Sequence, residues 1–177
     1  MSKSINSIVR KILDFLAEEA EYLPMPFETP YGWIRRTNRL SYKRYYDSVN
    51  QLRKSESVKV ISKEGKRFIK LTEKGVLKVL FEKAKIPYKK EWDGKWRIIL
   101  FDIPEDARKQ RGILRGLLKW NGFKLLQKSV FISPYELNPD AIEYLDRSGL
   151  IKYVRILRVD VIDGEMDLRK QFKLPKD

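Results

Sequence analysis

A short segment rich in charged residues, Lys85–Gly94, divides the chain into two parts whose apolar residues follow different spacings. Before it, apolar residues mostly recur every three or four positions, as in amphipathic helices. After it, short apolar runs such as Trp96–Phe101 alternate with helical patterns. The sequence therefore predicts an α+β protein with a domain at 1–84, a linker at 85–94, a second domain at 95–163 and a mobile polar tail at 164–177.

The first part has the element order of a winged helix-turn-helix domain. The expected elements are helices over about residues 4–21, 32–38 and 41–55, a hairpin over 58–71 and a helix from Thr72. Ser4 and Ser41 are suited to cap the first turns of their helices. Gly65 can take the positive φ that a tight hairpin turn needs.

The second part has the order β-α-β-β-α-β, which is that of a ferredoxin-like fold. The expected elements are a strand over 96–101, a helix from about 105 to Asn121, strands over 123–126 and 129–132, a helix around 141–145 and a strand over 152–161. The unbroken apolar run of the first strand indicates a central position in the sheet.

Charge and composition narrow the function. The net charge is +14, and residues 1–90 contain 21 Lys and Arg against 10 Asp and Glu, so most of the excess lies in the first part. Such a balance favours a polyanionic partner. The chain has no Cys and no His, which excludes the usual zinc sites, a Cys nucleophile and a Ser-His-Asp triad.

The basic residues between positions 31 and 70 form the strongest local signal. The helix over 41–55 has one apolar face, Tyr42, Tyr45, Tyr46, Val49 and Leu52, which we expect in the core. Its other face carries Lys43, Arg44, Asp47, Ser48, Asn50, Gln51 and Lys54. A helix of this kind fits the major groove of DNA, where Asn and Gln pair with adenine and Arg or Lys with guanine or phosphate.

We therefore expect DNA contacts from three segments. The predicted residues are Arg35, Arg36, Arg39 and Ser41 before the helix, Lys43, Arg44, Asn50, Gln51 and Lys54 on it, and Lys63, Lys66, Arg67 and Lys70 on the hairpin, or wing. Which of them read bases and which only hold phosphate is left open.

Two further motifs lie in the second part. Asp102, at the end of the expected strand, has two interpretations: a ligand for Mg²⁺ together with Glu105 or Asp106, or an N-cap with capping-box spacing to Glu105, which we favour. Ser129 has no histidine to activate it, so it and Gln127 are expected to hold the strand backbone or contact phosphate.

These motifs carry a family resemblance. The run Trp96-Arg97-Ile98-Ile99-Leu100-Phe101-Asp102-Ile103-Pro104-Glu105, followed by Gly122-Phe123 and by Leu126-Gln127-Lys128-Ser129-Val130-Phe131-Ile132-Ser133-Pro134-Tyr135, resembles the central domain of PaaX-type transcriptional repressors. That domain is itself similar to the second Cas protein, a small CRISPR-associated adaptation endonuclease. The resemblance implies a homodimer, a palindromic operator and repression; the CRISPR-type relatives imply a metal site at Asp102.

The resulting prediction is a cytoplasmic, dimeric transcriptional repressor of the PaaX type that binds double-stranded DNA and has no catalytic residues, no cofactor and no membrane association, with its effector unknown. The alternative is a Mg²⁺-dependent nuclease or CRISPR-adaptation subunit that uses Asp102. A third possibility is an RNA-binding adaptor, but the sequence lacks the Gly-aromatic stacking signature of an RNA recognition motif.

Overall fold

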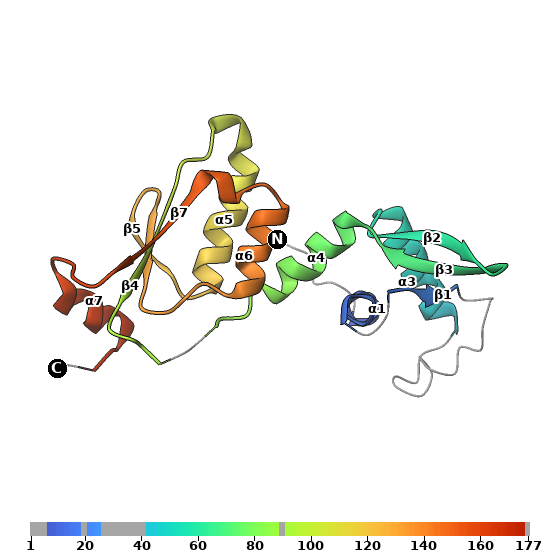
Figure 1. Ribbon diagram of the computed structural model, residues 1–177, viewed down its shortest axis with the longest axis horizontal. Coiled ribbons are helices and arrows are strands. Elements are labelled where there is room, and N and C mark those ends of the chain that lie inside the picture. Colours follow the sequence, from blue (N-terminus) through green and yellow to red (C-terminus); the bar gives the residue numbers. More distant parts are fainter. Residues whose placement is uncertain (1–6, 19–20, 26–41, 89–90, 176–177) are drawn as a thin grey trace. The chain divides into compact units, whose positions relative to one another are not determined.

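The computed structural model describes two compact units (Figure 1). The described residues are 7–18, 21–25, 42–88 and 91–175. The first unit is Met1–Val79 and the second is Leu80–Asp177. Both units combine helices with an antiparallel sheet, so the protein is of the α+β class. None of the helices in the described ranges has both the length and the apolar character needed to cross a bilayer.

In the described residues of the first unit, two helices pack against a three-stranded sheet. Its elements are α1 (Ser7–Glu18), β1 (Leu23–Pro24), α3 (Tyr42–Lys54), β2 (Val58–Lys63) and β3 (Lys66–Leu71), and α4 (Glu73–Lys83) begins in it. The strand order is β1-β3-β2. The core contains Val9, Ile12, Leu13 and Leu16 from α1, Tyr45, Val49 and Leu52 from α3, and Val58 and Ile69 from the sheet. The helical spacing in the sequence thus identified Tyr45, Val49 and Leu52 as buried correctly, whereas Tyr46, which was also expected in the core, is 36% exposed.

The hairpin of β2 and β3 closes through a two-residue turn. Lys63 pairs with Lys66, and both residues between them have positive φ, 52° at Glu64 and 71° at Gly65. Two positive φ angles are typical of the turn whose twist matches that of the flanking strands. The expected positive φ of Gly65 is confirmed.

The second unit has the predicted order β-α-β-β-α-β, with one helix added at its end. Its elements are β4 (Trp96–Phe101), the 3₁₀ turn η1 (Glu105–Ala107), α5 (Arg108–Trp120), β5 (Lys124–Gln127), β6 (Val130–Ser133), α6 (Pro139–Arg147), the 3₁₀ turn η2 (Ile151–Tyr153), β7 (Val154–Val159) and α7 (Glu165–Phe172). The sheet order is β5-β6-β4-β7, so β4 is central, as its apolar run predicted.

The two faces of this sheet are covered differently (Figure 1). Ile99 and Phe101 of β4 share a core with Leu114 of α5 and Leu145 of α6. Trp96, which alternates with them, lies on the opposite face in a smaller cluster. That cluster contains Ile132, Leu168 and Phe172, so α7 covers only the end of the face where β4 begins.

The structure corrects two expectations about residues near the ends of this unit. Residues 165–172 form helix α7 with Leu168 buried, whereas the sequence predicts an unstructured polar tail there. The tail prediction failed because three apolar positions in a polar helix are a weak periodic signal. Trp92, in the expected linker, stacks on Trp96 with ring centroids 5.5 Å apart, so the end of that segment packs on the sheet.

Candidate nucleic-acid interface

Helix α3 presents a polar stripe on its outer face. Lys43, Asp47, Asn50 and Lys54 follow one another at intervals of four, three and four residues, which places them in a line along the helix. Lys43, Asp47 and Lys54 are exposed and Asn50 is half-buried. Arg44 and Gln51, also exposed, flank this line on one side. The structure therefore brings together all five residues that the sequence proposed for this helix.

One residue of α3 lies on a different face from the one expected. Ser48 is only 3% exposed, although the sequence analysis placed it among the outward residues. It lies next to the buried Leu52 on the helical wheel, at the edge of the buried face, and its hydroxyl donates a hydrogen bond of 2.8 Å to the carbonyl of Arg44. This bond within the helix satisfies the hydroxyl and allows it to be buried.

The hairpin gathers four lysines on one face. The register pairs Lys59 with Lys70 and Lys63 with Lys66, and strand alternation puts all four on the face that also carries Ile61 and Phe68. We call these four residues the lysine face. Arg67, which pairs with Ser62, is exposed but points to the opposite face, so it lies apart from the other proposed wing residues.

Polar and aromatic neighbours hold two lysines of this face. The ammonium of Lys63 donates a hydrogen bond of 2.8 Å to the hydroxyl of Tyr22, and this bond raises the pKa of Lys63. The Tyr22 ring in turn meets Phe68 edge-on, with centroids 5.0 Å apart. Lys70 forms an ion pair with Glu21 and lowers the pKa of that carboxyl. Because the hydrogen bond to Tyr22 raises its pKa, Lys63 remains a cation through the physiological pH range.

The structure adds one residue to the predicted set and leaves four outside its described ranges. Lys59 was not predicted, although the two-residue alternation from Ile61 and Lys63 places it on the lysine face. The proposed residues without a described position are Arg35, Arg36, Arg39 and Ser41. The predicted helix over 32–38 and the capping by Ser4 and Ser41 also fall outside the described residues.

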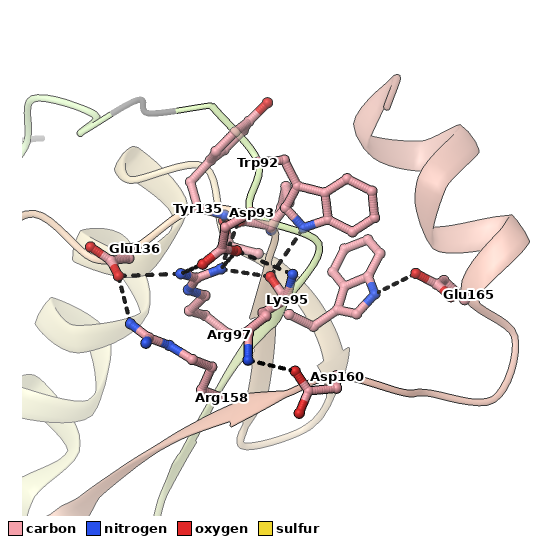
Figure 2. Close-up of polar contacts among 12 residues, drawn as sticks. Trp92, Asp93, Lys95, Arg97, Tyr135, Glu136, Arg158, Asp160 and Glu165 are labelled. Carbon is pink, nitrogen blue, oxygen red and sulfur yellow. Dashed lines mark hydrogen bonds and ion pairs between the residues drawn. The ribbon is translucent and has the colours of Figure 1, made fainter. Parts of the chain in front are cut away.

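The second unit contains a buried arginine whose two terminal nitrogens donate within the protein (Figure 2). Arg97 is 6% exposed and donates to both carboxylate oxygens of Asp93, to Glu136 at 3.2 Å, and to the carbonyls of Lys95 at 2.7 Å and Pro134 at 3.3 Å. The guanidinium lowers the pKa of Asp93 strongly. This network fastens the chain before β4 to the β6–α6 connection and leaves little of Arg97 for an external anion.

Asp102 and Ser129, from the two motifs of the second part, line a common pocket at the end of β4. Two backbone hydrogen bonds set this arrangement: the Phe101 amide donates to the Ser129 carbonyl at 3.1 Å, and the Asp102 amide donates to the Tyr153 carbonyl at 3.0 Å. The pocket measures about 510 Å³ and is lined by Leu100, Phe101, Asp102, Ser129, Val130, Lys152, Tyr153 and Arg155.

The favoured capping role of Asp102 is wrong. The short turn η1 begins at Glu105 with Pro104 as its N-cap, α5 begins at Arg108 with Ala107 as its N-cap, and neither receives a side-chain cap. Pro104, four positions before the first residue of α5, is followed by a 3₁₀ turn, which moves the helix start away from Asp102. The carboxylate is therefore exposed and faces the pocket instead.

The pocket does not fit the Mg²⁺ ion that the CRISPR-type resemblance implies. Lys152 and Arg155 line it together with Asp102, its one carboxylate, and their charge opposes a divalent cation. Across the described ranges of this chain, no three carboxylates gather closely enough to hold a metal.

The topology of the second unit, a four-stranded antiparallel sheet in a β-α-β-β-α-β chain with helices α5 and α6 on one face, defines a class of small α+β domains. Within that class, residues 89–171 match the family model described as the PaaX protein central Cas2-like domain. Residues 89–171 are therefore similar to the central domain of PaaX proteins, which confirms the resemblance predicted from the two motifs. No curated protein sequence shows significant similarity to the chain.

Proposed function

We propose that this protein is a dimeric DNA-binding transcriptional regulator, acting as a repressor, in which a winged helix-turn-helix unit is joined to a ferredoxin-like dimerisation domain. Its PaaX-type central domain supports a role in transcriptional regulation. The basic surface of the first unit supports DNA as the partner, with α3 as the recognition helix and the β2–β3 hairpin as the wing.

The observation that carries this proposal is the lysine face. Lys59 lies directly opposite Lys70, and Lys63 directly opposite Lys66, across one hairpin. Like charges in such positions repel each other and destabilise the free protein. A polyanion lying along the hairpin would remove that repulsion and release counterions as it binds. The arrangement is therefore unfavourable for folding alone and favourable for binding a nucleic acid.

The stripe on α3 supports double-stranded DNA in particular. An exposed helix face with Asn50 and Gln51 among the cations Lys43, Arg44 and Lys54 matches what the major groove accepts: the amides can pair with adenine while the cations reach guanine or phosphate. A single-stranded partner would instead call for exposed aromatic rings on which bases stack. Tyr46 is the one aromatic residue among the exposed side chains of α3 that the structure describes.

The incompletely covered face of the second sheet supports dimerisation with a second copy of the chain. Leu157 of β7 is 46% exposed and lies beside Ile98, on the face that α7 covers only in part. If Leu157 and Ile98 packed against the same residues of a second copy, the two copies would form a two-fold interface. Two identical DNA-binding units would then favour a palindromic operator.

Charge reversal on α3 tests the DNA-binding surface. Duplexes selected by the protein from a random pool would be titrated by fluorescence anisotropy over a range of salt concentrations. We expect Lys43→Glu/Arg44→Glu/Lys54→Glu to lower the affinity about 100-fold or more and to flatten the salt dependence, because each phosphate contact contributes about −0.9 to the log–log slope. Circular dichroism should remain unchanged.

A variant with the same change in net charge elsewhere is the matched control. Arg108→Glu/Lys109→Glu/Lys119→Glu alters three exposed cations of α5 in the second unit. We expect this variant to bind the selected duplex within about threefold of the wild type at physiological salt, where distant surface charges are screened. Equal losses in both variants would reject α3 as the interface.

The lysine face is tested by measuring stability and binding together. Lys59→Ala/Lys66→Ala removes one member of each opposed pair. We expect the free protein to be as stable as the wild type or more stable, by up to about 1 kcal/mol in urea titrations, because each repulsion is relieved. The DNA affinity should fall. A variant that binds DNA with undiminished affinity would remove the wing from the interface.

A further inference from the structure

The pocket at the end of β4 holds charged groups of both signs that do not pair with each other. Asp102, which follows β4, lines it together with Lys152 of η2 and Arg155 of β7. Among the ion pairs of the described residues, none includes Asp102, Lys152 or Arg155, so each carboxylate–cation distance in the pocket exceeds the 4.0 Å limit of an ion pair. The neighbouring Arg97 network differs, because there each cation meets a carboxylate.

The main chain accounts for this separation. Asp102 is fixed at the end of β4 by the hydrogen bond of its amide to the Tyr153 carbonyl. The Arg155 guanidinium is held on β7, where Nη1 donates to the carbonyls of Val154 at 3.0 Å and Lys152 at 3.4 Å. Both bonds use Nη1, which leaves Nη2 pre-oriented for a carboxylate from outside. The Lys152 ammonium lies 4.9 Å from the centre of the Tyr153 ring.

The remaining lining is mainly apolar and includes two hydroxyl-bearing residues, Ser129 and Tyr153. Leu100 and Val130 lie opposite each other across β4 and β6, and both are half-buried. A volume of about 510 Å³ is within the range of small-molecule sites, which combine an apolar lining with a few convergent polar groups.

We propose that this pocket binds a small amino acid or hydroxy acid with an apolar side chain. The ligand's carboxylate would lie on Arg155 and Lys152, its adjacent ammonium or hydroxyl would donate to Asp102, and its side chain would contact Leu100 and Val130. Such a ligand gives the cations Arg155 and Lys152 an anionic partner and gives Asp102 a hydrogen-bond donor. The protein itself supplies neither partner in the pocket. This inference concerns the second unit alone and does not depend on DNA binding.

Thermal unfolding of the full chain tests the proposal without DNA. The probes are the natural amino acids and the corresponding 2-hydroxy acids, each at millimolar concentration. For every probe that binds, two analogues follow: one without the amino or hydroxyl group and one without the carboxylate. We expect at least one probe to raise the Tm by about 3–6 °C, and both of its analogues to lose most of that shift.

Two pairs of variants locate the binding. Arg155→Gln and Asp102→Asn should each abolish the shift, whereas Lys119→Gln and Asp106→Asn, which change equally exposed charges outside the pocket, should retain it. A lack of stabilisation by every probe would overturn the proposal, and so would a shift that survives in Arg155→Gln. An equal shift from the analogue without the donor, or stabilisation by Mg²⁺ that Asp102→Asn removes, would also overturn it.

Discussion

Gly75, in helix α4, lies so close to Ser57 and Leu71 that a side chain would not fit. A Cβ at this residue would lie 2.0 Å from the carbonyl oxygen of Ser57 and 2.8 Å from a methyl group of Leu71. The same Ser57 carbonyl accepts a hydrogen bond of 3.1 Å from the Thr72 amide, and the Thr72 hydroxyl caps the helix at the Gly75 amide. The start of α4 thus packs directly against Ser57, in the segment between α3 and β2.

Gly75→Ala should destabilise the first unit by about 2–3 kcal/mol in urea unfolding followed by circular dichroism, because backbone must move to admit the methyl group. Gly112→Ala is the control, since Gly112 lies in α5 with no atom within 4 Å of an added Cβ. Alanine there should stabilise by about 0.5–1 kcal/mol. A similar effect of both substitutions would contradict the packing at Gly75.

Asp93 makes stability depend on pH. The Arg97 guanidinium lowers the pKa of Asp93 in the folded protein, so the unfolded chain binds a proton more readily. The stabilising contribution is therefore complete above the unfolded pKa of about 4 and is lost as the pH falls below it. Between about pH 5 and pH 2.5, the free energy of unfolding should fall more steeply for the wild type than for Asp93→Asn. Parallel curves for the two proteins would show that the pair contributes nothing.

At the scale of single elements, the hairpin is the part whose local sequence fits its structure least well. Glu64 has a φ of 52° in a turn that favours Asn or Asp at this position. It is also the acidic residue at the tip of an otherwise basic hairpin, between Lys63 and Lys66.

Glu64→Asn should raise the stability of the first unit by about 0.5 kcal/mol, because Asn tolerates the left-handed conformation better. It should also strengthen DNA binding, since it removes a negative charge from the wing. Gly65→Ala is the comparison: an added Cβ meets nothing within 4 Å, so a loss of about 1 kcal/mol would come from its φ of 71° alone. Urea unfolding and anisotropy measure the two effects, and a destabilised Glu64→Asn would contradict the turn geometry.

At the scale of the whole molecule, the proposed dimer depends on one side of strand β7. Leu157→Glu places a charge on the incompletely covered face and should convert the dimer into a monomer in light-scattering measurements. Ile156→Glu is the control, because Ile156 is similarly exposed at 44% but alternates to the helix-covered side. Loss of the dimer in both variants would indicate pairing through the edge of β7 instead, and a dimer in both would exclude this strand.

Hydrophobic spacing and charge are local properties, and they were enough to predict the α+β class, the burial of Tyr45, Val49 and Leu52 in α3, the central position of β4 and the outward polar residues of α3 other than Ser48. The PaaX-type domain was predictable because its two motifs are contiguous runs at a defined separation. The DNA-binding role and the dimer remain proposals that rest on the same charge pattern and family.

Other features exist only once distant segments meet. Helix α7 is ordered because Trp96 and Ile132 offer an apolar surface on which its few apolar residues pack. The pocket joins Asp102 to Lys152 and Arg155, some 50 residues later, through the pairing of β4 with β7. No local sequence pattern predicts that these three residues share a pocket, because the order of the strands in the sheet brings them together.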